Sequence, residues 1–179
     1  GPLTNIARLA EAEPDLLREK AELWIMGGAA KSHGNCSPLA EFNFWVDPHA
    51  AQLVFEKLED IRLVPLDVTR EIVFRPDYRE LARQLGGPFG KFIHAITRYY
   101  VDFHWAQERT LGCVINDPLA VALALDPSLG TAEPYAVEII PEGPSMGQSV
   151  VDFAGFHGRP ANASIFLETE PERFFASFF

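Results

Sequence analysis

The sequence predicts an α/β fold in which a Rossmann-like, open and largely parallel sheet is flanked by helices, within a single domain over residues 1–179. Two observations carry this prediction. Short apolar runs that are typical of buried strands alternate with longer segments of helical periodicity, which is the pattern of βαβ units. In addition, 47% of the residues are hydrophobic and 22% are charged, which suits the core of one ordinary globular domain.

In the first half of the chain, helices are expected over 4–12 and 47–58. Thr4 is a candidate N-cap for the first helix, and Asp47-Pro48 has the aspartate and proline that often begin a helix. Apolar runs over 22–26 and 61–66 predict buried strands. A loop rich in glycine and proline follows the first of these strands.

In the second half, helices are expected over 80–85 and 88–107, separated by two glycines, and over 117–125 and 171–179. Strands are expected over 136–140, 149–153 and 164–168. In a doubly wound sheet a buried strand normally precedes each helix along the chain, but no strand precedes the helix at 4–12. We therefore expect the domain to be incomplete at its N-terminus, with ligand-binding loops at the carboxyl ends of its strands.

Composition narrows the range of partners. The chain carries 25 acidic and 15 basic residues, and this net charge of -10 disfavours binding to nucleic acid. No apolar run approaches the roughly 20 residues that span a bilayer, so no membrane partner is expected. Two cysteines are too few for a disulfide framework and favour a reducing, cytoplasmic location.

Several short motifs follow one another at characteristic spacings. Residues 1–7 read GPLTNIA, 26–28 read MGG, 34–35 read GN, 40–43 read AEFN, 66–69 read LDVT and 116–120 read NDPLA. Each motif alone is weak evidence, but their order is specific. Together they resemble the inosine-uridine-preferring nucleoside hydrolases over almost the whole chain. That family cleaves the N-glycosidic bond of ribonucleosides with a bound calcium ion.

The resemblance implies a site for calcium and ribose. The calcium ligands would be the backbone carbonyl of Thr4 and the carboxylate of Asp117. The residues that would hold the ribose are Met26, Asn35, Glu41 and Asn43. A hard cation bound by oxygen atoms can acidify and position water. Polar groups that hold the ribose hydroxyls fix the ring for an oxocarbenium-like transition state.

Each of these residues also has an ordinary structural explanation. Thr4 and Asp117 could be only helix N-caps, and Glu41 could belong to a solvated loop. Asp67 of the LDVT motif is more typical of a residue that anchors a turn. The order of the motifs nevertheless favours function for Asn35, Glu41, Asn43 and Asp117.

The chain departs from the family pattern in its metal ligands. The motif D-x-D-x-x-x-D-D, which supplies most of the calcium ligands in the family, does not occur in these 179 residues. Thr4 and Asp117 cannot by themselves complete a coordination shell of six to eight oxygens. The chain is therefore a fragment, a degenerate relative, or one that receives its missing ligands from another chain.

A second departure concerns the proton donor for the leaving base. Asn116 replaces the histidine that many relatives use, and an amide cannot act as a general acid at neutral pH. His104, which shares a helical face with Tyr100, is the candidate replacement, because an ordinary histidine titrates near pH 6.5, roughly at neutrality. His104 could equally be a packed histidine. Arg70 stands where relatives often carry histidine, and the sequence assigns it no function.

The sequence thus predicts a calcium-dependent enzyme that hydrolyses purine, pyrimidine or modified ribonucleosides, with His104 and Asn116 as its catalytic candidates. We expect a homo-oligomer, either a dimer or a tetramer, or association with a missing N-terminal half. One alternative is a catalytically inactive nucleoside-binding or assembly subunit of the same fold. A purely structural oligomerisation domain is the other alternative, and it predicts no ligand in the crevice.

Overall fold

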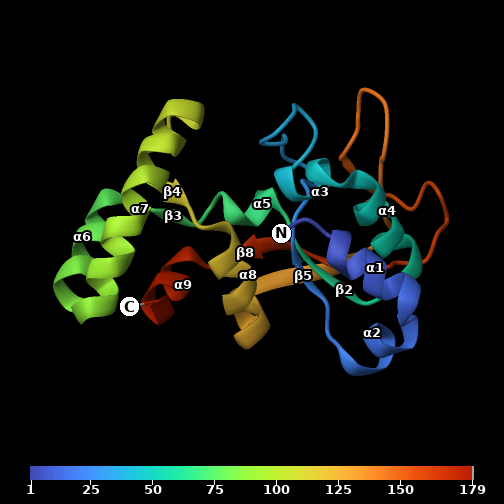
Figure 1. Ribbon diagram of the computed structural model, residues 1–179, viewed down its shortest axis with the longest axis horizontal. Helices are drawn as coiled ribbons and strands as arrows, with labels where there is room; N and C mark the ends of the chain where they lie inside the picture. The colour runs from blue at the N-terminus through green and yellow to red at the C-terminus, as the bar shows by residue number, and fades with distance from the viewer. Residues whose placement is uncertain (179) are drawn as a thin grey trace.

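The computed structural model describes residues 1–178, apart from the side chain of Lys20, and it has an α/β architecture (Figure 1). Three strands of the main sheet run parallel: β1 (Trp24–Met26), β2 (Ile61–Val64) and β8 (Ala163–Thr169). The fourth strand, β5 (Gly130–Tyr135), pairs antiparallel with β8, and the strand order is β1-β2-β8-β5. The predicted open, largely parallel sheet is therefore confirmed.

One face of this sheet packs against two helices of the first half, α1 (Thr4–Ala12) and α4 (Pro48–Lys57). Ile25, Leu63 and Ile165 are almost completely buried in this core. They come from three neighbouring strands, and their strand neighbours point to the other face, as the pleat requires. The first core thus holds the strands in register beneath the site.

The other face packs against α5 (Leu66–Thr69), α8 (Asn116–Leu125) and α9 (Pro171–Phe178). Met26 and Phe166 are the strand residues at the centre of this second core. Helix α9 was predicted over 171–179, and Phe179 lies outside the described residues. No helix in the described part of the chain is both long and apolar enough to cross a membrane.

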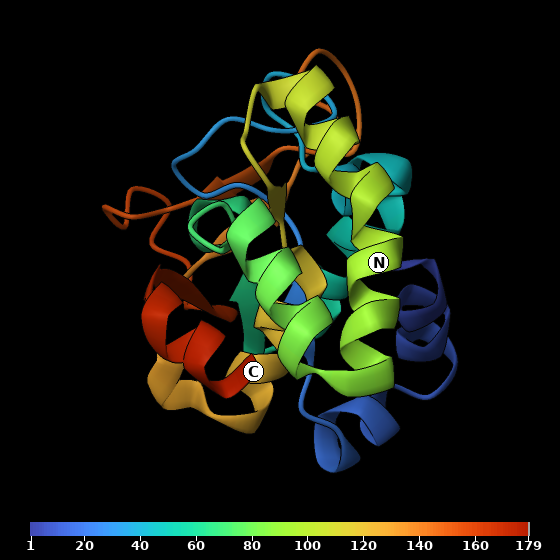
Figure 2. The same ribbon diagram turned by 90° about the vertical axis from the view of Figure 1, so that its left-hand side faces the viewer.

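A pair of helices, α6 (Pro76–Leu85) and α7 (Gly87–Glu108), lies at one end of the molecule (Figure 1). Figure 2 shows the two helices side by side. A short antiparallel ribbon of β3 (Val73–Phe74) and β4 (Cys113–Val114) connects them to the body. Because the ribbon fixes both ends of the pair, α7 is held beside the carboxyl ends of the main strands.

The prediction for the last third of the sheet was partly wrong. Two of the expected strands, β6 (Val137–Ile139) and β7 (Ser149–Val151), pair with each other outside the main sheet. The place beside β8 is taken by β5, which was not expected. This strand contains Pro134, which lacks a backbone N–H and is tolerated because β5 is an edge strand.

Several short helices were also not expected. They are α2 (Pro14–Lys20), α3 (Phe42–Val46), α5 and the 3-10 helix η1 (Pro127–Leu129). The predicted strand over 61–66 ends at Val64, because Pro65 cannot donate to the sheet and Leu66 begins α5. The turn into α5 brings the LDVT motif next to the glycine-rich loop after β1.

The N-cap assignments were correct only for α4, where Asp47 accepts a hydrogen bond of 3.1 Å from the backbone N–H of Ala50. Thr4 is the first residue of α1, and its hydroxyl donates to the carboxylate of Asp47 instead. This bond lowers the pKa of Asp47 and joins the starts of the two helices. Asp117 lies within the first turn of α8 and makes no capping hydrogen bond.

Candidate active site

A cavity of about 630 Å³ lies between the loop after β1, helix α7 and the start of α8. Every candidate residue except Thr4 lines it: Met26, Asn35, Glu41, Asn43, His104, Asn116 and Asp117. Thr4, whose backbone carbonyl was the expected calcium ligand, lies outside the lining, and its hydroxyl donates to Asp47. The carboxyl ends of β1 and β2 thus bring together residues up to 91 positions apart, from Met26 to Asp117.

The loop after β1 requires glycine because it passes very close to its neighbours. Gly28 has a φ of +72°, and a Cβ there would lie 2.8 Å from the Phe44 ring and from the Ser149 hydroxyl. Ser149 Oγ exchanges two hydrogen bonds of 2.9 Å with the backbone N–H and carbonyl of Ala29. The loop is therefore fixed by contacts with α3 and β7.

Glu41 is a buried carboxylate at the start of α3, with only 2% of its surface exposed. It accepts hydrogen bonds from the backbone N–H groups of Gly28 (3.1 Å), Asn43 (2.9 Å) and Phe44 (3.3 Å). Burial raises its pKa, and these three bonds oppose that shift. The alternative that Glu41 belongs to a solvated loop is therefore wrong. A carboxylate has about four acceptor positions, so one remains for a ligand hydroxyl.

The two asparagines present different amide atoms to a ligand. Asn43 Nδ2 donates to the carbonyl oxygen of Met26 (3.1 Å) and lies 3.4 Å from its sulfur. A carbonyl can only accept, so this contact fixes the amide and leaves Asn43 Oδ1 as an acceptor. Asn35 Oδ1 accepts from the backbone N–H of Phe42 (2.9 Å), which leaves Asn35 Nδ2 as a donor. Together the two side chains offer a ligand hydroxyl one acceptor, Asn43 Oδ1, and one donor, Asn35 Nδ2.

His104 and Tyr100 form the α7 side of the cavity. The two rings meet edge to face with their centres 4.4 Å apart, and His104 is 5% exposed. His104 Nδ1 lies 3.0 Å from the carbonyl oxygen of Tyr100. Nδ1 must therefore carry a hydrogen, because that oxygen can only accept. Any proton that His104 gives to a ligand comes from Nε2.

The start of α8 contributes Asn116 and Asp117. Asn116 Nδ2 donates to the Tyr100 hydroxyl at 3.3 Å, whereas its buried Oδ1 has no partner among the described residues. Burial raises the pKa of Tyr100, so this hydroxyl stays protonated and can donate. A buried acceptor without a hydrogen-bond partner costs free energy of folding. A ligand with an N–H or O–H group would donate to Asn116 Oδ1 and remove that cost.

The sequence analysis did not identify every residue of the cavity. Gln107 and Glu108 lie on α7 and line its far end. They follow His104 by three and four residues, so helical spacing could have identified both. Phe42 and Phe103 also contribute apolar surface, but an exposed phenylalanine carries no comparable signal in the sequence.

The described residues do not fit a calcium ion by themselves. No group of three or more histidine, cysteine or acidic side chains among them is arranged to hold a metal. The oxygens of Glu41 are mostly occupied by backbone N–H groups, which leaves Asp117 and Glu108 as the other carboxylates of the lining. Two carboxylates fall short of the six to eight oxygens that calcium requires.

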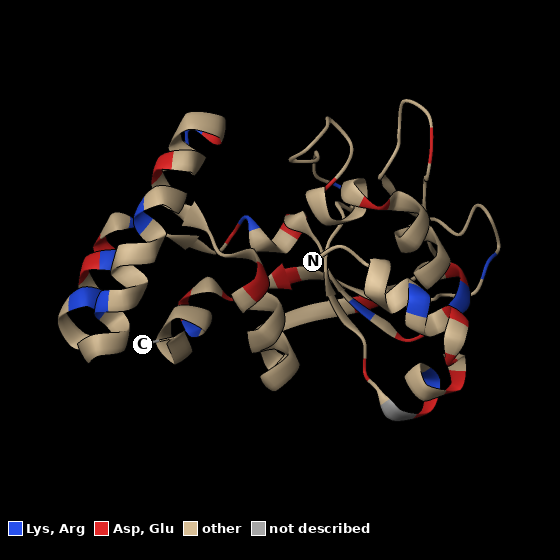
Figure 3. Cartoon of the chain, viewed as in Figure 1, with Lys and Arg blue, Asp and Glu red and all other residues tan. Residues whose placement is uncertain are grey.

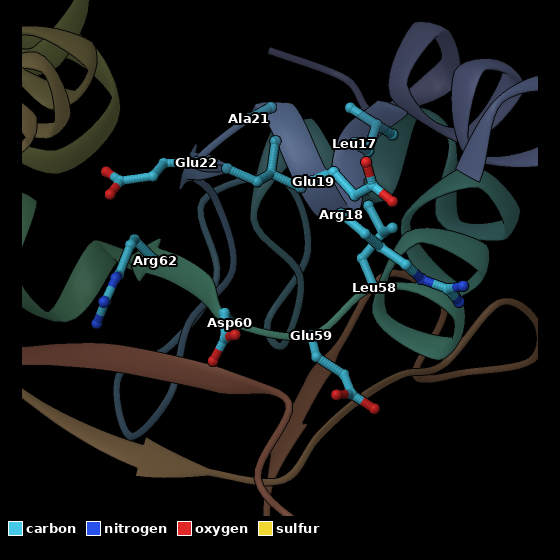
Figure 4. Close-up of a pocket in the computed structure, with 10 residues that line it drawn as sticks. Leu17, Arg18, Glu19, Ala21, Glu22, Leu58, Glu59, Asp60 and Arg62 are labelled. Atoms are coloured by element: carbon cyan, nitrogen blue, oxygen red, sulfur yellow. The ribbon is translucent and has the colours of Figure 1, made fainter. Parts of the chain in front are cut away.

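A larger hollow of about 910 Å³ lies at the opposite, amino ends of β1 and β2 (Figure 4). Figure 4 shows that the polar side chains of Arg18, Glu22 and Glu59 point away from one another there. All three are exposed to solvent. Size alone therefore does not indicate function, and the smaller cavity has the convergent polar groups of a ligand site.

The α/β sheet places these motif residues together at its strand ends, as the resemblance to the nucleoside hydrolase family implies. Residues 1–176 match the family described as inosine-uridine preferring nucleoside hydrolase, and the chain belongs to that family. It is 37% identical to the non-specific ribonucleoside hydrolase RihC of Escherichia coli strain K12 over 175 residues. That match covers 97% of this chain and 56% of RihC.

Solved structures agree with this assignment. The purine-preferring ribonucleoside hydrolase from Gardnerella vaginalis matches 99% of this chain with a TM-score of 0.90 and 31% identity. A plant nucleoside hydrolase matches 98% of the chain with a TM-score of 0.90 and 27% identity. In both cases 57% of the solved chain is covered. The present chain thus spans little more than half the length of its relatives.

Proposed function

We propose that the protein containing this chain hydrolyses the N-glycosidic bond of ribonucleosides and releases free base and ribose. The main support is the cavity in which seven residues of the family motifs and of α7 meet. Its purine, pyrimidine or modified substrate would be an uncharged nucleoside, which suits a chain of net charge -10. Two cysteines without disulfide partners suit a cytoplasmic location.

The residues divide into a ribose side and a base side. Asn35 Nδ2, Asn43 Oδ1 and the remaining acceptor position of Glu41 would hold the ribose hydroxyls. On the base side, the Tyr100 hydroxyl and Asn116 Oδ1 would hydrogen-bond the nucleobase. The bond between C1′ and the base nitrogen breaks, and its electron pair stays on the base, which takes a proton from His104 Nε2. Water then adds to C1′ and loses a proton.

A nucleoside scan of the full-length protein tests this proposal. Each ribonucleoside is incubated with the protein, and free base and ribose are measured together. Equal amounts of base and ribose are expected for at least one nucleoside. Binding without release of either product would contradict the hydrolase proposal and favour the inactive binding subunit. The observation that favours this second function is the incomplete metal-ligand set in the described residues.

We expect the 179-residue chain alone to bind calcium weakly or not at all. Asp117 and Glu108 are the carboxylates of the cavity lining that are not held by backbone N–H groups, and calcium requires several more oxygens. Calorimetric titration should give a Kd weaker than the micromolar range, whereas the full-length protein should bind tightly if it carries the aspartate-rich motif. A micromolar or tighter Kd for the chain alone would contradict this prediction.

Replacing Asn116 with alanine is expected to change base preference in the full-length protein more than ribose binding. Loss of its unpaired Oδ1 removes one hydrogen bond from those bases that donate to it. Relative kcat/KM among nucleosides should shift by about tenfold, the equivalent of one such bond. Competition between pairs of nucleosides measures the shift directly. A uniform loss across all bases would assign Asn116 a structural role.

We also propose that this chain functions in association, either as a homo-oligomer or with the remaining part of the family domain. β1 is an edge strand of the described sheet although Ile25 and Met26 are buried. On α8, Leu125 is 83% exposed, and Figure 3 shows almost no charged residue on that helix. Uncovered strand edges and apolar helix faces promote association.

The stability of the isolated chain tests this association. Its thermal transition should be broad or should shift with protein concentration, because unfolding would be linked to dissociation. Differential scanning calorimetry at several concentrations, together with the mass from analytical ultracentrifugation, measures both effects. A sharp, concentration-independent transition of a monomer would contradict the proposal.

A further inference from the structure

Two charged side chains, Asp67 within the LDVT segment and Arg70 directly after it, hydrogen-bond to the glycine-rich loop. Asp67 accepts hydrogen bonds from the backbone N–H groups of Ala30 (2.7 Å), Lys31 (2.8 Å) and Ser32 (2.9 Å). Asp67 was predicted to anchor a turn, and these contacts show that it anchors residues 30–32 of the loop. These bonds end at Ser32. The next residues of the loop, His33 and Gly34, which line the cavity, are held by a different side chain.

Arg70 holds that following part. Its Nη1 donates to the carbonyl oxygen of His33 at 2.7 Å, and its Nη2 donates to that of Gly34 at 3.0 Å. Nη1 also lies 3.2 Å from the Ser32 hydroxyl. A guanidinium presents several donors in a fixed plane, so these bonds define both the position and the direction of the chain.

The backbone that carries Arg70 is held firmly in the core. Arg70 directly follows α5, whose Val68 and Thr69 are completely buried. The other end of the loop is equally constrained, because a Cβ on Gly34 would lie 2.2 Å from the carbonyl oxygen of Ala40. Gly34 therefore cannot move toward residue 40, and the bonds from Arg70 restrain it on the other side.

The residue directly after this restrained segment is Asn35. Its backbone N–H donates to the carbonyl oxygen of Ala40 at 3.1 Å, and its Oδ1 accepts from the N–H of Phe42 at 2.9 Å. Asn35 is exposed, and these two bonds tie it to residues 40 and 42. The residues before it, His33 and Gly34, set the backbone position from which it makes these bonds.

We propose that Arg70 is a positioning residue: through the carbonyl groups of His33 and Gly34, it fixes Asn35 at the mouth of the cavity. Asp67 fixes the preceding residues, so α5 and the residue after it support residues 30–34 of the loop. The role in substrate binding rests on the proposed function, whereas the role in holding Asn35 does not.

Amide hydrogen exchange of the 179-residue chain tests the structural part. In Arg70→Ala, the Phe42 amide should exchange about tenfold faster, because Asn35 Oδ1 no longer protects it. Asn35→Ala gives the maximum rate for that amide. Arg75→Ala, which removes an exposed arginine paired with Asp77, is the matched control and should leave the rate unchanged.

Two results would overturn the proposal. One is an unchanged Phe42 rate in Arg70→Ala. The other is an equal increase at Leu63 in the core strand β2, which would show general destabilisation. Arg70→Lys keeps the charge but not the planar fork, so its Phe42 rate should lie between those of the wild type and Arg70→Ala.

Kinetics of the full-length protein test the functional part. Arg70→Ala should raise KM for inosine about tenfold and change kcat less, because a displaced Asn35 weakens ribose binding before the chemical step. An unchanged KM would show that the loop contact has no role in binding. Failure of the wild-type protein to cleave any nucleoside would contradict the proposed function, and the exchange result would still decide the role of Arg70.

Discussion

Turnover of natural nucleosides is expected to fall by about 100-fold when His104 is replaced with alanine in the full-length protein, the usual effect of losing a general acid. The leaving base needs a proton, and Asn116 cannot supply one at neutral pH. In the cavity, the Nδ1 hydrogen of His104 is held by the Tyr100 carbonyl, which leaves Nε2 to donate. Steady-state kcat for inosine and uridine measures the effect.

A nitrophenyl riboside separates acid catalysis from packing. Its leaving group needs no protonation, so His104→Ala should slow this substrate far less than the natural ones. His104 also packs against Tyr100 and Phe103, and its loss could disturb the cavity in general. His104→Gln fills more of the space without a titratable proton and serves as the packing control. If natural and activated substrates slow equally, His104 is a packing residue and the acid assignment is wrong.

Glu41→Ala is expected to lower the free energy of unfolding by about 3 kcal/mol or more, because each buried N–H left without a partner costs about 1–3 kcal/mol. Three such groups, on Gly28, Asn43 and Phe44, bond to this carboxylate. Urea unfolding of the 179-residue chain measures the loss. Glu41→Gln keeps the volume and one acceptor oxygen, and it should lose less. A change below about 0.5 kcal/mol in Glu41→Ala would rule out the structural role.

The same carboxylate predicts a pH dependence of stability. Burial raises the pKa of Glu41 above its ordinary value of 4.5, so the folded state binds its proton more tightly than the unfolded state does. The contribution of this group is therefore most favourable below pH 4.5 and declines as pH rises through the folded pKa. In Glu41→Gln that decline should be absent. Identical pH slopes for wild type and Glu41→Gln would contradict the raised pKa.

The fold was largely predictable because its parallel strands are buried on both faces and read as apolar runs. Ile61, Leu63 and Val64 are examples, each at most 1% exposed. The partners of the later strands were not predictable in this way. The local sequence predicted β6 and β7 as strands, but it does not specify which sheet they join. β5 was missed because Pro134 and exposed residues weaken the pattern at an edge.

For the site, the motifs predicted that six residues meet in one crevice, but not that Thr4 lies outside it or how the side chains are hydrogen-bonded. Thr4 and Asp117 each precede or begin a helix in the way that N-caps do, yet neither side chain caps its own helix. The hydroxyl of Thr4 donates to Asp47, a residue 43 positions away. Local sequence patterns cannot predict a partner at that distance along the chain. The unpaired Oδ1 of Asn116 likewise depends on the fold around it. Side-chain partners distant in sequence required the structure.

The contact between Ser149 and Ala29 has a consequence for synthesis on the ribosome. The two residues are 120 positions apart, yet their paired hydrogen bonds hold the loop after β1 in place. A growing chain that has not yet emerged past Ser149 can pair β1 with β2 but cannot complete this loop. Contacts of such long sequence separation form late, because the entropy of closing the intervening chain must be overcome first. The ribose side of the cavity is therefore completed only after Ser149 has emerged, well after its own residues, Met26 to Asn43, have been made.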